Sequence, residues 1–139
     1  MVEVLSFYGF DIGEQAIGKG LYNTIWPGRC EVIKENPLVV LDGAQNLASA
    51  ATLKSAIRDN FSATGGSAFG GKYRKLILVL GISEDKDISG ICKTLDPLAD
   101  TVILTRASTS RATDPVKLSG YFRKKVYLTQ SVKEAKLLA

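Results

Sequence analysis

The sequence of 139 residues has the composition of one globular domain, because 45% of its residues are hydrophobic and 23% are charged. No apolar run approaches the roughly 20 residues that a transmembrane helix needs, and the first residues do not resemble a secretory signal. The net charge of +4 is modest, and no basic stripe with interleaved aromatic residues suggests nucleic-acid binding. We therefore expect a cytoplasmic protein that binds neither a membrane nor nucleic acid.

Two residue types limit the chemistry that the chain can perform. Histidine is absent, which removes the commonest general base and the commonest zinc ligand. Cys30 and Cys92 are the only cysteines and lie in no metal-ligand spacing, so buried free thiols are favoured over a disulfide. We predict no metal site and no catalytic residue within the chain. The basic cluster of residues 123–125 is interpreted as the solvated entry to a strand.

Strand and helix patterns alternate along the chain. Asp11 and Glu14 have the spacing of a capping box and predict a helix over residues 12–23, after which the WPGR turn follows. The continuous apolar run of residues 38–41 is typical of a strand that is buried on both faces. Further strands are predicted over residues 76–80, 101–105 and 126–129, and further helices over residues 47–61, 88–98, 115–121 and 131–139.

This alternation predicts an α/β fold with an open, mostly parallel, Rossmann-like sheet and helices on both faces. Ligands of such sheets bind at the carboxyl ends of the strands. Asp42 and the polar loops of residues 81–87 and 106–114 all follow predicted strands. We therefore expect these three segments to lie along one rim and to share a site.

Residues 66–72 match the pattern of a phosphate-binding loop, but we interpret the match as accidental. Tyr73 stands where Ser or Thr would reach Mg²⁺, and the segment precedes a strand instead of following one.

Asp42 and Arg29 are the first candidates for a binding site. A carboxylate at the end of a strand can accept hydrogen bonds from ribose hydroxyls, although Asp42 is also well placed to cap the helix that follows. The fork of Arg29 suits phosphate, although a surface salt bridge is the alternative role.

Four motifs then occur in order: WPGRCEVI at residues 26–33, PLVVLDGAQN at residues 37–46, LVLGISEDKD at residues 78–87 and TSRATDP at residues 109–115. Together they closely resemble the C-terminal domain of the folylpolyglutamate synthase and dihydrofolate synthase family, within the Mur ligase superfamily. The resemblance implies that residues 1–27 are the closing helix of a central ATPase domain with its linker. It also implies that residues 28–139 are a C-terminal domain that is incomplete at its C-terminal end.

The function implied by this resemblance is ATP-dependent addition of L-glutamate to a folate through an acyl phosphate. ATP and Mg²⁺ are the implied cofactors. The glycine-rich ATP loop, the Mg²⁺ ligands and most of the folate site of this family belong to the other domain, so we expect this chain alone to be inactive. The implied partners are folate, L-glutamate and the ATPase domain of the same protein.

The resemblance also implies an ATP-binding set of four residues: Arg29 near phosphate, Asp42 at the ribose, and Gln45 with Asn46 beside them. The family has D-G-A-H-N where this chain has D-G-A-Q-N. Glutamine can replace a neutral imidazole in a hydrogen bond, but it does not titrate near pH 7. Activity survives the change if the family histidine only orients the nucleotide, and it is altered if that histidine must carry a proton.

Arg111 matches the arginine of the loop that helps to hold the carboxylate of the incoming amino acid in related ligases. Ser110 beside it either contacts substrate or closes its own turn. Lys86 and Asp87 lie at the rim of the site, where Asp87 is also placed to cap the next helix.

Two rival interpretations remain open. A ligase acting on peptidoglycan precursors would resemble D-Y-A-H at the strand end, so Gly43 favours the folate family. A non-catalytic, nucleotide-sensing α/β module would fit the change to Gln45.

Overall fold

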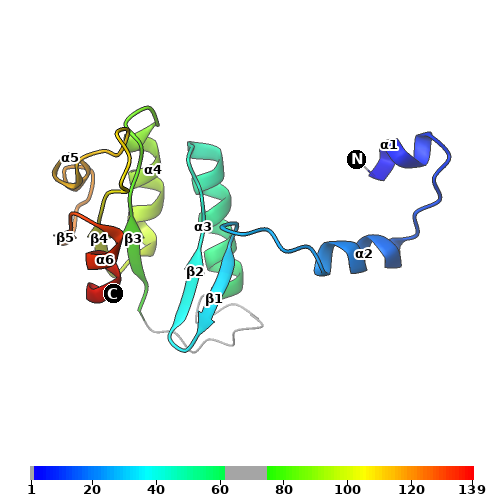
Figure 1. Ribbon diagram of the computed structural model, residues 1–139, viewed down its shortest axis with the longest axis horizontal. Coiled ribbons are helices and arrows are strands. Elements are labelled where there is room, and N and C mark those ends of the chain that lie inside the picture. Colours follow the sequence, from blue (N-terminus) through cyan, green and yellow to red (C-terminus); the bar gives the residue numbers. More distant parts are fainter. Residues whose placement is uncertain (1, 62–74) are drawn as a thin grey trace.

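The computed structural model describes residues 2–61 and 75–139 and shows an α/β body with a helical arm at its N-terminal end (Figure 1). The elements in chain order are α1 (Val2–Phe7), α2 (Glu14–Tyr22), β1 (Glu31–Glu35), β2 (Leu38–Leu41), α3 (Leu47–Phe61), β3 (Ile77–Leu80), α4 (Ile88–Leu95), the 3-10 helix η1 (Asp96–Leu98), β4 (Thr101–Leu104), α5 (Pro115–Ser119), β5 (Val126–Leu128) and α6 (Val132–Leu138). The predicted alternation is therefore confirmed. The segment of residues 66–72 lies outside the described residues.

Strands β3, β4 and β5 form a parallel sheet with β4 in the centre, which confirms the predicted α/β class. Successive residues of β4 point to opposite faces of this sheet. Val102 and Leu104 are fully buried in a core that includes Ile91 of α4 and Leu118 of α5. Ile103 is buried on the other face of the sheet. Helix α6 contacts β4, and its Leu138 lies near Ile103 on that face. Helices therefore cover both faces of the sheet.

The position predicted for β2 is wrong. Residues 38–41 form an antiparallel hairpin with β1, separate from the parallel sheet, and they are half-buried or exposed instead of buried on both faces. The physical reason is the turn at Asn36-Pro37, because two residues can join antiparallel strands, whereas a parallel pair needs a long crossover. β3 is also less buried than predicted: Ile77 is 42% and Val79 is 40% exposed.

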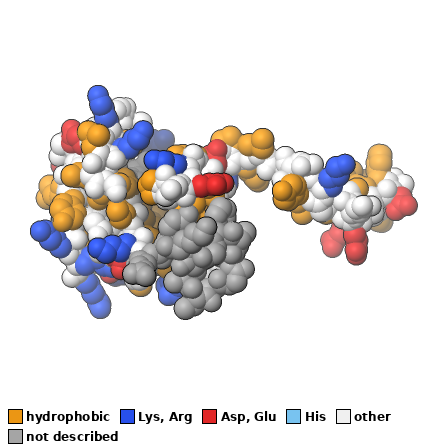
Figure 2. Space-filling model, turned by 90° about the horizontal axis from the view of Figure 1, so that it is seen from below, with side chains coloured by type: hydrophobic (Ala, Val, Ile, Leu, Met, Phe, Trp, Pro, Cys, Tyr) orange, Lys and Arg blue, Asp and Glu red, His pale blue; other side chains and the backbone are white. Residues whose placement is uncertain are grey.

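The N-terminal arm, defined here as residues 2–26, carries many apolar side chains that contact little else. Figures 1 and 2 show it extending away from the body, with hydrophobic groups along its length. Its exposed large apolar residues are Val4, Leu5, Phe7, Tyr8, Phe10, Leu21, Tyr22, Ile25 and Trp26. The predicted capping box is wrong, because the N-cap of α2 is Gly13 and no side chain caps it.

One member of the basic cluster departs from the predicted solvated role. Lys124 is half-buried, donates hydrogen bonds to the carbonyl oxygens of Asp96 and Ala99, and forms an ion pair of 3.5 Å with the Asp96 carboxylate. A lysine that binds the last carbonyls of a helical segment stabilises its C-terminus. Within the described ranges, no helix is long and apolar enough to span a bilayer.

Candidate functional site

The open end of the β1–β2 hairpin is held together by a carboxylate. Asp42 accepts a hydrogen bond of 2.8 Å from the Cys30 amide through Oδ2 and one of 2.7 Å from the Ala44 amide through Oδ1. The Gly43 amide also donates to the Gly28 carbonyl at 2.8 Å. Gly28 and Cys30 both have positive φ, 69° and 47°, which turns the chain sharply before β1. Asp42 thus ties the WPGR turn to the end of β2.

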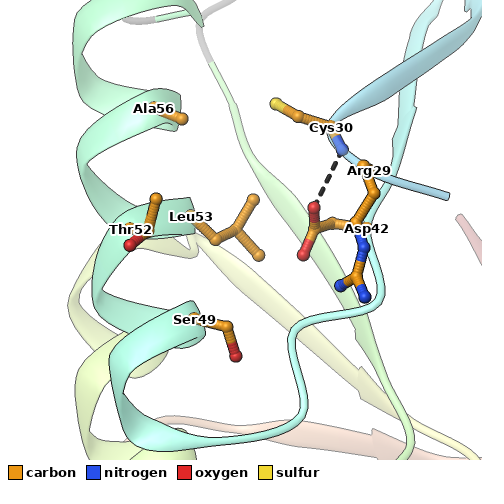
Figure 3. Close-up of a pocket in the computed structure, with 7 residues that line it drawn as sticks. All are labelled: Arg29, Cys30, Asp42, Ser49, Thr52, Leu53 and Ala56. Carbon is orange, nitrogen blue, oxygen red and sulfur yellow. Dashed lines mark hydrogen bonds between the residues drawn. The ribbon is translucent and has the colours of Figure 1, made fainter. Parts of the chain in front are cut away.

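A pocket of about 330 Å³ lies between this end of the hairpin and α3. Its lining residues are Arg29, Cys30, Asp42, Ser49, Thr52, Leu53 and Ala56. Figure 3 shows Asp42 and Cys30 across the pocket from the four α3 side chains. The guanidinium of Arg29 donates one hydrogen bond of 3.3 Å to the Gly43 carbonyl. Since a guanidinium has five N–H donors, others remain for an anion.

The helix-cap alternative for Asp42 is wrong. The N-cap role belongs to Asn46, whose Oδ1 accepts the Ser49 amide at 2.8 Å, while the Ser49 hydroxyl accepts the Asn46 amide at 3.1 Å. This reciprocal pair is a form of capping box. Each oxygen of Asp42 accepts one backbone bond and therefore keeps a lone pair for a ligand. Gln45 donates its amide to the Ser49 hydroxyl at 3.0 Å and has an exposed side chain.

Both cysteines are free thiols, as predicted; Cys92 is buried as expected, whereas Cys30 is only half-buried. Burial, and to a smaller extent the charge of Asp42, raises the pKa of Cys30. Burial followed by the charge of Asp96 raises the pKa of Cys92 to about 11. Across residues 2–61 and 75–139, no group of three or more His, Cys, Asp or Glu residues could hold a metal ion.

The polar loops after β3 and β4 form a second group at the carboxyl edge of the parallel sheet. The Glu84 amide donates to the Arg111 carbonyl at 2.8 Å, and the Thr113 amide donates to the Ile82 carbonyl at 2.9 Å. An isolated antiparallel bridge joins Ser83 to Ala112 between them. Two of the three predicted rim segments are therefore in contact.

Three charged side chains, the exposed Asp85 and Arg111 and the half-buried Lys86, lie in this second group. Lys86 forms an ion pair of 2.8 Å with Asp85. The pKa of the Asp85 carboxyl is lowered, first by the hydrogen bond from Lys86 and to a smaller extent by the charge of Arg111. Arg111 and Ser110 are both exposed to solvent. The exposed guanidinium of Arg111 can attract an anionic ligand.

The cap role foreseen for Asp87 is confirmed, because its Oδ1 accepts the Gly90 amide at 2.9 Å at the start of α4. The third rim segment, which contains Asp42, forms a separate group here, and its sharing of one site with the other two segments stays a prediction. In the described part of the chain, no hydrogen bond, ion pair or pocket connects Asp42 with Arg111. The predicted site is thus two groups, one at the hairpin and α3, the other at the β3 and β4 loops.

Sequence reasoning missed the contribution of α3 to the pocket. The pattern of residues 47–61 predicts a helix but does not indicate that Ser49, Thr52, Leu53 and Ala56 line a pocket. The spacing of Asn46 and Ser49 in a capping pattern was a signal that could have identified the true cap.

A parallel α/β sheet with polar loops at its carboxyl edge, beside a pocket lined by an arginine and a carboxylate, is typical of α/β domains that bind ligands. Comparison with known families is more specific. Residues 28–138 match the family described as "Mur ligase, glutamate ligase domain", and the chain belongs to this family.

Curated and solved relatives agree with this assignment. The chain is 38% identical over 114 residues to the probable bifunctional folylpolyglutamate synthase/dihydropteroate synthase of Haloferax volcanii, covering 82% of the chain and 12% of that protein. Folylpolyglutamate synthase from Mycobacterium tuberculosis, solved with ADP and AMPPCP, superimposes with a TM-score of 0.80 at 28% identity. E. coli FolC, solved with DHPP and ADP, superimposes with a TM-score of 0.82 at 25% identity.

The chain corresponds to only part of these relatives. The superpositions cover 96% and 99% of the chain but 29% and 31% of the two solved proteins.

Proposed function

We propose that this chain acts as the C-terminal domain of a longer ATP-dependent amide ligase that adds L-glutamate to a folate. The observation that carries the proposal is the pocket at the hairpin, where Arg29 and Asp42 share one wall, in a domain of the glutamate ligase family. Relatives named as folylpolyglutamate synthases, one of them solved with ADP, support the same conclusion.

In this proposal the pocket binds one side of ATP. The free lone pairs of Asp42 accept the ribose hydroxyls, and the unused N–H groups of Arg29 bind phosphate. Leu53 and Ala56 offer an apolar surface to the adenine base. Gln45 and Asn46 complete the loop between Asp42 and the start of α3. Gln45 has the orienting role that a neutral imidazole would have, because an amide forms hydrogen bonds without titrating.

The second group binds the glutamate. Arg111 pairs with a carboxylate of the incoming amino acid in bidentate fashion, and Ser110 lies beside it. Lys86 and Asp87 shape the rim, the latter by capping α4. The folate carboxylate attacks the terminal phosphorus of ATP and releases ADP. The glutamate amine then attacks the acyl phosphate, which forms the amide and releases phosphate.

The remaining parts of the ligase lie outside this domain. The described residues do not fit a metal site, so we propose that Mg²⁺ is held by the ATPase domain. The apolar arm packs against that domain as its closing helix and linker, which would cover the side chains that are exposed here. The two groups of the site would face a shared interdomain cleft. We propose a cytoplasmic location for the enzyme.

The proposal is tested with the complete protein, supplied with ATP, a reduced folate and L-glutamate. We expect ADP release that requires both the folate and the glutamate, and the 139-residue chain alone should release none. ADP release with a peptidoglycan precursor instead of the folate would contradict the proposal. So would turnover by the isolated chain.

A further inference from the structure

Ser49 lines the pocket, but its hydroxyl and its amide form hydrogen bonds with the neighbouring loop, defined here as residues 42–46. Its hydroxyl accepts the amides of Gln45 and Asn46 at 3.0 and 3.1 Å and donates to the Asn46 carbonyl at 3.0 Å. Its own amide donates to the Asn46 side chain at 2.8 Å. Four hydrogen bonds therefore join one serine to two consecutive loop residues.

These bonds use the full capacity of the Ser49 hydroxyl. A hydroxyl has one hydrogen to donate and two lone pairs to accept with, and all three are occupied. A ligand in the pocket could bond to Ser49 only by displacing a loop contact. Ser49 is therefore suited to holding other residues and poorly suited to contacting ligand itself.

The loop is anchored at both ends by this arrangement. At its first end Asp42 accepts the Ala44 amide, and at its last end Ser49 accepts the Gln45 and Asn46 amides. The exposed side chain of Gln45, for which no hydrogen bond is recorded within residues 2–61 and 75–139, extends from this restrained segment. Loss of the Ser49 hydroxyl would free the backbone that carries the Gln45 side chain.

We propose that Ser49 is a positioning residue, which sets nucleotide affinity by fixing the backbone of residues 44–46 on the pocket wall. This inference rests on the proposed function, because it assumes that the pocket binds ATP. Ser49 acts through Gln45 and Asn46, because its hydroxyl has no hydrogen-bonding capacity left for the nucleotide.

Three variants of the complete protein test the proposal: Ser49→Ala, which removes the hydroxyl, Ser49→Thr, which keeps one, and Ser55→Ala as the matched control. Ser55 lies on the same helix, is exposed and does not line the pocket. Two quantities are measured for each protein. One is the ADP dissociation constant, and the other is the hydrogen exchange rate of the Gln45 and Asn46 amides.

We expect Ser49→Ala to raise the ADP dissociation constant about tenfold, the scale of losing one or two neutral hydrogen bonds that order a binding loop. The Gln45 and Asn46 amides should exchange faster, while amides of α4 exchange as in the unmodified protein. Ser49→Thr should recover most of the affinity, and Ser55→Ala should change neither quantity.

The outcomes separate this inference from the proposed function. An unmodified protein that binds no ADP refutes the proposed function and the positioning role together. If ADP binds, unchanged affinity in Ser49→Ala overturns the positioning role alone, even when the two amides exchange faster. Equal weakening in Ser49→Ala and Ser55→Ala also overturns it, because the effect would then belong to the helix as a whole.

Discussion

Replacing Asp42 by alanine separates a binding role from a structural one. The change removes the acceptor of two backbone amides, those of Cys30 and Ala44. Both hydrogen bonds are exposed, so water can replace them, and each contributes about 0.5–1.5 kcal/mol to stability. We therefore expect the free energy of unfolding to fall by about 1–3 kcal/mol through a looser hairpin end. The start of α3 should stay intact, because Asn46 caps it.

The effect of Asp42→Ala on nucleotide affinity follows from the lone pairs that the carboxylate keeps for a ligand. Loss of a charged acceptor for the ribose hydroxyls should weaken nucleotide binding by about 1–3 kcal/mol, or about 5-fold to 150-fold in the dissociation constant. Calorimetric titration of the complete protein with ADP measures this, and urea denaturation measures the stability. Destabilisation of the expected size with unchanged ADP affinity would refute the nucleotide role and leave Asp42 as a clamp for the hairpin.

Three further outcomes are expected. Lys124→Met should lower the free energy of unfolding by about 1–3 kcal/mol, because the Ala99 carbonyl loses the Lys124 donor and the Asp96 carboxylate loses its ion-pair partner. Lys133→Ala should change it little, and equal melting temperatures of the two variants would contradict this. Arg111→Ala in the complete enzyme should raise the KM for glutamate more than the KM for ATP, and a reversed order would contradict it. Because folding raises the pKa of Cys92 to about 11, the folded protein holds this proton more tightly, and stability should fall as pH rises from the ordinary thiol range through about 11. Alkaline denaturation of Cys92→Ala, compared with the unmodified chain, checks the sign.

The parallel part of the fold was predictable from sequence because its strands are apolar runs between amphipathic helices. Residues 101–104 and the helix starting at residue 88 show this most clearly, since β4 is buried on both faces and Asp87 caps α4 as its position suggested. Local signals of this kind need no knowledge of the rest of the chain.

The predictions that failed depended on tertiary context. The run of residues 38–41 is as apolar as β4, yet the short turn at Asn36-Pro37 makes it one arm of a hairpin. Asp11 and Glu14 have the spacing of a capping box, but the helix begins at Glu14 with Gly13 as its N-cap. Lys124 looked solvated beside two other basic residues, and only the folded chain brings it to the end of α4 and η1.

The candidate site was half predictable. The two motifs that contain Arg29 and Asp42 pointed to residues that line one pocket. The opposing wall comes from α3, whose pocket residues carry no chemical signal in the sequence. How Asp42 and Arg111 lie relative to each other depends on how the hairpin sits beside the sheet, which residue spacing does not encode.

The arm has a practical consequence for anyone who purifies this chain. Unshielded aromatic and aliphatic groups such as Phe7, Tyr22 and Trp26 gain free energy when they leave water, and in dilute buffer the available surface is another copy of the protein. The isolated chain should therefore aggregate more as its concentration rises and when sulfate is added, because sulfate strengthens the burial of apolar groups. Titrations that use the isolated chain require a dilution series, so that loss of soluble monomer is not mistaken for ligand binding.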